Sequence, residues 1–346
     1  MASVHGRPQP QSDQGSSSTA CNNSPALCDR GYNNITHLGG HNSAFLRDES
    51  TGNSLSGNQY HNATRALDAG LRLLQAQVHK ANNSLSLCHT SCELLDAGPL
   101  EDWLSAINVW MDANPNDVVT IILVNAAQAT ADEYGAIFES SGLGQKGYTP
   151  ATPGATGDWP TLQTMIDDNQ RVVFFVTDVQ SSQNSPSVLP QFDYVFETHF
   201  DVTELDGFNC TLDRPSTLDS ATSAVSSNYL GLVNHFKYQR LTADIQLPDI
   251  DTIQTVNSAN TNEVGNLGRH LDSCNSEWGT LPNFVLIDFF DEANPLDAVD
   301  RMNQVSDATG RTDAPAGDGT SGAVSKPRGL EFGALLAFFS AALLLV

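Results

Sequence analysis

The amino-acid sequence predicts an α/β protein built as a TIM-type (β/α)8 barrel, in regular or distorted form. Two observations favour this fold. Short apolar runs alternate with helix-like stretches over roughly 270 residues, as in chains that form a parallel sheet. Polar residues also stand at the carboxyl ends of these runs, where the chemistry of such barrels takes place. An open, doubly wound sheet is the alternative, but no glycine-rich phosphate-binding fingerprint supports it.

The predicted strands are mostly continuous valine, isoleucine, leucine and phenylalanine runs, as expected when both faces of a parallel strand are buried. They span Ile35–Gly40, Leu71–Val78, Leu85–Cys88, Val118–Val124, Val172–Val176, Tyr194–Glu197, Tyr229–Val233 and Phe284–Ile287. Polar residues at or near their carboxyl ends are expected to share one rim, namely His41, Gln75, Gln77, His89, Asn125, Asp178, Glu197, Asn234 and Asp288.

The clearest predicted helix begins at Pro99, because proline is favoured at the first helical position. Apolar residues then recur at helical spacing until Asn114-Pro115 ends the helix. Leu162–Asp168 and Pro295–Asn303 are further predicted helices. Residues 21–307 are therefore expected to form one barrel domain, preceded by a disordered segment, residues 1–20, that is rich in serine, glutamine and glycine.

The C-terminal region has the pattern of a GPI-attachment signal. Residues 308–329 are predicted to form a flexible stalk, and residues 330–346 are almost wholly apolar. Small residues at 321–323, a polar spacer and an apolar end predict attachment at Ser321 or at one of the next two residues, Gly322 and Ala323. A tail anchor is the alternative, although the apolar stretch is short for a spanning helix. We expect a GPI-anchored protein on the extracellular face of the plasma membrane or cell wall. No signal peptide is visible in this chain, so the natural N-terminus is expected to differ.

Charge and cysteine content agree with an exported protein. The chain carries 40 acidic and 16 basic residues and a net charge of −24, which argues against nucleic acid and against capture by anionic lipid. Its even cysteine count favours three disulfides in an oxidising compartment, with the pairs Cys21–Cys28, Cys88–Cys92 and Cys210–Cys274. Sequons predict glycosylation, and the expected acceptors are Asn34, Asn62, Asn82 and Asn209. A monomer is expected.

Two histidines at the ends of strand-like runs carry most of the chemical information. His41 lies in the segment Gly-His-Asn-Ser, and His89 lies in Leu-Cys-His. Because histidine titrates near neutrality, two in one pocket can act as a general base and a general acid. A zinc site is less favoured, since no further cysteine or histidine falls at ligand spacing.

The order of these motifs, with Asp-Ala-Gly-x-Arg at 68–72 between them and Gly-Pro-Leu-Glu-Asp-Trp-Leu at 98–104 after them, resembles the catalytic half of phosphatidylinositol-specific phospholipases C. The likeness is greatest to the secreted, fungal-type phospholipase C-like phosphodiesterases. It implies that His41 is the general base and His89 the general acid. It also implies an aspartate late in the barrel that orients the base, for which Asp288 matches and Asp291 is a nearby alternative.

Charge balance at the phosphoryl group is where the sequence departs from that family. Bacterial members end the second strand with Asp-x-Arg, and calcium-dependent eukaryotic members place acidic metal ligands there. This sequence has Gln75 and Gln77 instead, and Asn42 follows His41. Neutral amides replace neither a guanidinium nor a calcium ligand at comparable strength, so no metal or other cofactor is expected. Residues expected to bind substrate are Asn42, Arg72, Gln75, Gln77, Asn125 and Asn234.

Two functions remain open at this point. One is an extracellular phosphoric diester hydrolase that acts on an inositol phospholipid, a glycolipid or a related phosphodiester. The other is a cell-surface protein that keeps the barrel and binds a ligand without efficient turnover. The histidine pair favours the enzyme, and the two glutamines favour the binding protein. Without the arginine, slow turnover is expected, and Gln77→Arg is expected to raise it where the pocket accepts the larger side chain.

Overall fold

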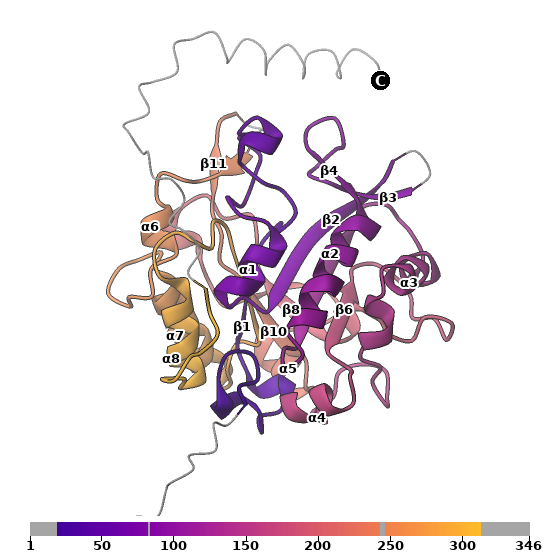
Figure 1. Cartoon of the computed structure of the whole chain (residues 1–346). Coiled ribbons are helices and arrows are strands. Elements are labelled where there is room, and N and C mark those ends of the chain that lie inside the picture. Colours follow the sequence, from indigo (N-terminus) through magenta and orange to yellow (C-terminus); the bar gives the residue numbers. More distant parts are fainter. Residues whose placement is uncertain (1–18, 82–83, 243–245, 313–346) are drawn as a thin grey trace, which may run out of the picture.

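Eight parallel strands follow one another around a curled sheet, with helices packed around its outside (Figure 1). The computed structural model of the chain describes residues 19–81, 84–242 and 246–312. Within these residues the parallel strands are β1 (His37–Gly40), β2 (Leu73–Ala81), β5 (Val119–Asn125), β6 (Val172–Val176), β7 (Val188–Pro190), β8 (Val195–Thr198), β10 (Leu230–Asn234) and β13 (Phe284–Ile287). The predicted α/β barrel is confirmed.

The barrel is distorted because its ring of hydrogen bonds is open at one place. The ladder runs without interruption from β8 through β10, β13, β1, β2, β5 and β6 to β7. In the described part of the chain no ladder joins β7 to β8, and a short 3-10 helix, Gln191–Asp193, links them. At this seam β8 pairs instead with an antiparallel strand, β9 (Leu212–Arg214). A separate hairpin consists of β11 (Tyr238–Arg240) and β12 (Gln246–Pro248).

One predicted strand has a different role from the others. The run Leu85–Cys88 forms β3 (Ser84–Cys88), which returns antiparallel to β2 and then pairs with β4 (Asp96–Pro99). These two strands extend β2 beyond the ring and do not belong to it. Strand β7 takes the remaining place in the ring, and its three residues are too few to give a periodic pattern.

The helices are α1 (Ala63–Ala69), α2 (Leu100–Ala113), α3 (Ala131–Ser140), α4 (Leu162–Asp167), α5 (Ala221–Ser226), α6 (Ile253–Val256), α7 (Leu267–Trp278) and α8 (Pro295–Asn303). Three of them, α2, α4 and α8, were expected from the sequence. Pro99 is the N-cap of α2 rather than its first residue. A capping box between Thr130 and Glu133 begins α3. The side chain of each residue accepts a hydrogen bond from the backbone N–H of the other, and these N–H groups would otherwise have no partner in the helix.

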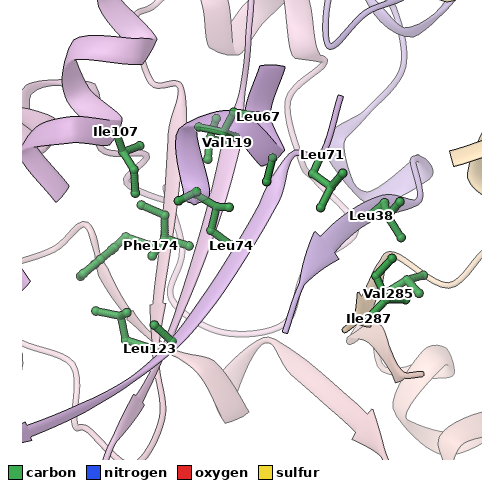
Figure 2. Packing of buried hydrophobic residues seen from close by; sticks show 14 of the residues in the cluster. Leu38, Leu67, Leu71, Leu74, Ile107, Val119, Leu123, Phe174, Val285 and Ile287 are labelled. Atoms are coloured by element: carbon green, nitrogen blue, oxygen red, sulfur yellow. The ribbon is translucent and has the colours of Figure 1, made fainter. Parts of the chain in front are cut away.

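Side chains alternate between two apolar layers along each strand. Leu74 on β2, Phe174 on β6 and Ile287 on β13 point outward and pack in one cluster with helix residues such as Ile107 (Figure 2). Their neighbours in sequence, such as Leu73, Phe175 and Leu286, belong to a second cluster that fills the barrel. Side chains alternate along a strand, so every second residue after these also points into the barrel. The last of these inward-pointing residues lie at the carboxyl rim.

Three disulfides join the predicted cysteine pairs. Cys21–Cys28 and Cys88–Cys92 close short loops, and Cys210–Cys274 links the segment before β9 to α7 across 64 residues. Loop closure of this kind stabilises a protein by about 2–4 kcal/mol through restriction of the unfolded chain.

Several predicted features of export can be located on the fold. The sequon residues Asn34, Asn62 and Asn209 are exposed. Asn82, residues 1–18 and the predicted GPI region with Ser321 lie outside the described residues. Among the residues that are described, no helix has the length and apolar character needed to cross a membrane.

Candidate functional site

His41 and Asp288 meet because their strands are neighbours in the ring. Gly40 at the end of β1 is paired with Ile287 at the end of β13, so the residues that follow them stand side by side on the rim. His41 donates its backbone N–H to the carbonyl of Ile287 at 2.8 Å. Its Nδ1 lies 2.8 Å from Oδ1 of Asp288. Both side chains are buried, with Asp288 only 1% exposed.

The surroundings of this pair fix the tautomer and the plane of the imidazole. The Asp288 carboxylate accepts from Nδ1–H of His41, which leaves Nε2 as the basic nitrogen. Asn58 donates a second hydrogen bond to the same oxygen at 3.0 Å. The ring of Phe236 stacks on the imidazole with centroids 3.6 Å apart and planes 1° apart. Gln59 holds the backbone by donating to the carbonyls of His41 and Ile287. The arrangement suits a general base.

His89 lies at the end of β3, in a loop closed by the Cys88–Cys92 disulfide. Its backbone N–H donates to Leu95, and its ring meets the edge of Phe45 at 5.1 Å between centroids. Burial, with a smaller contribution from the neighbouring histidines His41 and His79, lowers the pKa of His89 to about 4. The loop that carries His89 is joined to the loop that carries His41 through Gln77, which bonds to Thr90 and to Asn42.

Gln75, Gln77 and Asn42 form a chain of amides between the two histidine loops. Oε1 of Gln75 accepts the backbone N–H of Asn42 at 2.7 Å. Nε2 of Gln77 donates to Oδ1 of Asn42 at 3.4 Å, and its Oε1 accepts the backbone N–H of Thr90 at 3.2 Å. These three residues, expected to bind substrate, therefore lie together beside His41 and His89.

The backbone takes an unusual conformation directly after each of the three candidate catalytic residues. Asn42, Thr90 and Phe289 follow His41, His89 and Asp288, and have φ values of 51°, 63° and 45°. Left-handed backbone is uncommon outside glycine, especially for a β-branched residue such as threonine and a bulky one such as phenylalanine. Such residues cost of order 1–3 kcal/mol each and cluster at functional sites. The repetition marks this rim as a site.

Known proteins resemble this chain over most of its length. The family model described as PI-PLC X 1 matches residues 27–303. The chain belongs to the PI-PLC X family. PI-PLC X domain-containing protein 1 of Arthroderma benhamiae is 35% identical over 288 residues, which cover 82% of this chain and 89% of that protein. An "Uncharacterized secreted protein" of the same fungus is 32% identical over 319 residues, or 88% of this chain and 69% of that protein.

A solved structure with the same fold is the phosphatidylinositol-specific phospholipase C from Listeria monocytogenes. It superposes with a TM-score of 0.52 and 15% sequence identity, over 80% of this chain and 95% of the bacterial one. At this identity the likeness concerns the fold alone. It agrees with the distorted barrel of this PI-PLC X chain, in which eight parallel strands lie in the described ring.

Arg72 is not brought to the site of this PI-PLC X chain. It precedes β2 and lies at the amino end of the barrel, where it lines a hollow of about 310 Å³ with Trp110 and Asp117. Its guanidinium pairs with Asp117 at 2.8 and 2.9 Å, donates to the carbonyls of Leu67 and Leu71, and lies over the ring of Trp110. The side chain has a structural role at the end opposite His41.

Asn125 and Asn234 lie on the carboxyl rim but apart from the amide chain. Asn125 closes the loop after β5 through three hydrogen bonds, two with the backbone of Ala129 and one with the hydroxyl of Tyr134. Asn234 donates to the carbonyl of Thr198 at 2.8 Å, which ties β10 to β8. Their predicted contact with substrate stays a prediction.

The three amides Asn42, Gln75 and Gln77 do not fit a calcium ion. Oδ1 of Asn42 and the side-chain oxygens of Gln75 and Gln77 already accept hydrogen bonds, and none of the three supplies a carboxylate. The one cluster of potential ligands found among the described residues is Cys210, His270 and Cys274, where a disulfide joins the two sulfurs.

Three residues of the site had no counterpart in the sequence analysis. Phe236 continues the inward line of β10, two residues after Asn234, so strand periodicity could have indicated it. Asn58 and Gln59 come from the loop before α1 and carry no periodic signal. Only the folded chain shows that they support His41 and Asp288.

Proposed function

We propose that this PI-PLC X chain is an extracellular phosphoric diester hydrolase that acts on an inositol phospholipid or a related phosphodiester. The observation that carries the proposal is the His41–Asp288 hydrogen bond of 2.8 Å on the same rim as His89. This is a base with an orienting carboxylate, placed opposite a second titratable ring. The family membership and the bacterial fold neighbour support the same class of reaction.

The proposed reaction uses the substrate's own neighbouring hydroxyl as nucleophile. Nε2 of His41 takes the hydroxyl proton while the oxygen attacks phosphorus. The bond from phosphorus to the leaving alcohol breaks, and His89 delivers a proton to that oxygen. Asp288 stays ionised and stabilises the imidazolium formed on His41. The cyclic phosphodiester that results is opened when a water takes the place of the alcohol and the two histidines exchange roles.

His89 must carry a proton to act as the acid. Burial lowers its pKa to about 4 in the free protein, so a neutral ring prevails at pH 7. A bound phosphodiester anion would counter this effect, because a nearby negative charge favours the charged imidazole. Substrate binding and protonation of His89 are therefore expected to be coupled.

The alternative function is a surface protein that binds a phosphodiester without efficient turnover. The observation that favours it is the neutral character of the amide chain, since no guanidinium or metal ligand is part of that chain. Charge on the phosphoryl oxygens would then be balanced only by neutral donors, which stabilise an anion less than charged ones do.

The experiment that separates the two functions uses purified protein on a panel of phosphatidylinositol, glycolipid and soluble phosphodiester substrates. We expect turnover of at least one inositol phosphodiester, and equal rates with and without a calcium chelator, because Asn42, Gln75 and Gln77 offer no carboxylate for calcium. Turnover equal to that of a His41→Ala/His89→Ala variant on every substrate would reject the enzyme and favour the alternative, a protein that binds a phosphodiester without efficient turnover. Loss of activity with chelator and recovery with calcium would show that metal ligands lie elsewhere in the chain.

Attachment to the cell surface through a GPI anchor is proposed from the sequence. The three disulfides and a relative named as secreted support the extracellular setting. Expressed in a eukaryotic host with an added signal peptide, the mature protein is expected to lack the peptide after about residue 321. Mass spectrometry of the C-terminal peptide checks this. Retention of residues 330–346, or resistance to enzymes that release GPI anchors, would contradict it.

A further inference from the structure

Gln77 touches both histidine loops at once. Its side-chain oxygen accepts the backbone N–H of Thr90, the residue after His89, at 3.2 Å. Its nitrogen donates to Oδ1 of Asn42, the residue after His41, at 3.4 Å. Gln77 itself lies on β2, the strand between these loops, and is partly buried. A single amide therefore connects the base side and the acid side of the rim.

The backbone donor at Thr90 fixes the direction of the side-chain amides of Gln77 and Asn42. A backbone N–H can only donate, so the oxygen of Gln77 must face it and the nitrogen of Gln77 must face Asn42. Oδ1 of Asn42 is then the accepting atom, and its Nδ2 points away from Gln77. In the same way, the backbone N–H of Asn42 donates to Oε1 of Gln75. The side-chain nitrogen of Gln75, Nε2, therefore points away from this N–H.

The fixed direction leaves a donor in need of an acceptor. Nδ2 of Asn42 is buried and has no hydrogen-bond partner among the residues that the structure describes. Asn42 is fully buried and held in left-handed backbone, so its side chain has little freedom to turn. An unsatisfied buried donor is costly, and an anionic oxygen beside His41 would satisfy it.

We propose that Gln77 is a positioning residue that sets the spacing of the two histidine loops and aims the amide nitrogen of Asn42 at a phosphoryl oxygen. The proposal rests on the proposed function, which it deepens by naming neutral amide donors as the groups that balance phosphoryl charge. The same geometry reverses the effect expected for Gln77→Arg. A guanidinium has no acceptor, so Gln77→Arg leaves the N–H of Thr90 without a partner and releases the His89 loop, even though its N–H groups can still donate to Asn42.

The test compares two substitutions at Gln77 with a matched control. Gln77→Met keeps the length of the side chain and removes both hydrogen bonds without adding charge. Gln77→Glu keeps an acceptor for Thr90 and removes the donor to Asn42, so two acceptor oxygens face each other there, and its added negative charge also repels phosphate. Gln145→Met makes the same change at an exposed residue of the short helix Leu143–Lys146, which packs against α2 and α3 outside the strand ring.

Two measurements are made on each protein. Inorganic phosphate is titrated while the imidazole signals of His41 and His89 are followed by NMR, and kcat and KM are measured on an active substrate from the panel. We expect both Gln77 variants to bind phosphate about 10-fold more weakly and to lower kcat roughly 10- to 100-fold, since small errors in position cost this much. KM should change less than kcat, and Gln145→Met should match the wild type in both measurements.

The possible results separate this proposal from the proposed function. A Gln77→Met protein with wild-type phosphate affinity and kcat would overturn the positioning role. Wild-type protein whose histidine signals do not respond to phosphate would overturn the phosphoryl-oxygen site. Should Gln77→Met fail to fold, the uncharged Gln77→Asn decides, because its side chain is too short to join Thr90 and Asn42 as Gln77 does. Phosphate binding that depends on Gln77, without turnover of any phosphodiester, would support the positioning role of Gln77 and reject the proposal that the protein is an enzyme.

Discussion

Replacing His41 or His89 by alanine is expected to lower kcat/KM by about 10²–10⁴, because each removes a positioned proton-transfer group from the transition state. The loss of activity in the double variant should be smaller than the product of the two single losses, since the effects of groups that act in one step are not additive. Initial rates on the best substrate of the panel measure this effect.

His199→Ala is the matched control for this experiment. His199 is a partly exposed histidine after β8 that lies 3.4 Å from Asp213, and it has no contact with the amide chain. Its substitution should leave kcat/KM near the wild-type value. A His199 variant that loses as much activity as the His41 variant would assign the chemistry to another part of the rim.

The pH dependence of kcat/KM is an independent test of the role of His89. Proton transfer in both directions requires one ring to be charged and the other neutral, so kcat/KM should be bell-shaped in pH. One limb should fall near pH 4, because burial lowers the pKa of His89 to about 4 in the free protein. His89→Ala should remove that limb. A wild-type profile that is flat between pH 3 and pH 7 would show that His89 does not titrate in the reaction.

Strand periodicity accounts for much of what could be predicted. The runs followed directly by His41 and Asp288 are short, apolar and parallel, so their carboxyl ends meet on one rim. The pairing of Gly40 with Ile287 then places the first and last of these residues side by side. His89 was identified by its motif, although its strand lies outside the ring and runs antiparallel. Its place near His41 depends on the return of β3 along β2.

What could not be predicted depends on contacts without a local pattern. Asn58 reaches Asp288 from a loop 230 residues earlier in the chain, and nothing in its own segment indicates this. Arg72 sits two residues before Leu74 in a continuous apolar run, so the sequence does not show that it precedes the strand and faces Asp117. The two ends of Gln77 are the clearest case, since the residue type alone does not tell which atoms it joins.

Acidification from pH 7 to pH 4 is expected to destabilise the protein strongly, because several buried histidines are kept neutral by the fold. Burial lowers the pKa of His37 and of His270 to about 4, and it lowers the pKa of His235 well below the ordinary value of 6.5. With His89, four histidines share this behaviour. All four lie within or beside the barrel, so their protonation opposes folding.

The sign follows from the number of protons bound in each state. Between pH 6.5 and about pH 4 the unfolded chain protonates these rings and the folded chain does not, so stability rises with pH over this window. Each histidine whose pKa falls from 6.5 to about 4 contributes an effect of about 3 kcal/mol when fully expressed. Burial raises the pKa of three carboxyl groups, Asp193, Glu197 and Glu292, and these act in the opposite direction to the four histidines.

Urea unfolding at half-unit intervals from pH 7 to pH 4 measures the effect, and His37→Gln isolates one contribution. His37 is buried between Tyr32 and Phe284 at the floor of the barrel, and glutamine there can still donate to the carbonyl of Tyr32 but cannot take up a proton. We expect the variant to be less stable at pH 7 and to lose less stability on acidification than the wild type. Proton uptake on unfolding is the expected cause, so an equal dependence of the free energy of unfolding on pH in the two proteins would show that His37 is not held neutral. A wild-type free energy of unfolding that does not change between pH 6.5 and pH 4 would reject the mechanism for all four histidines.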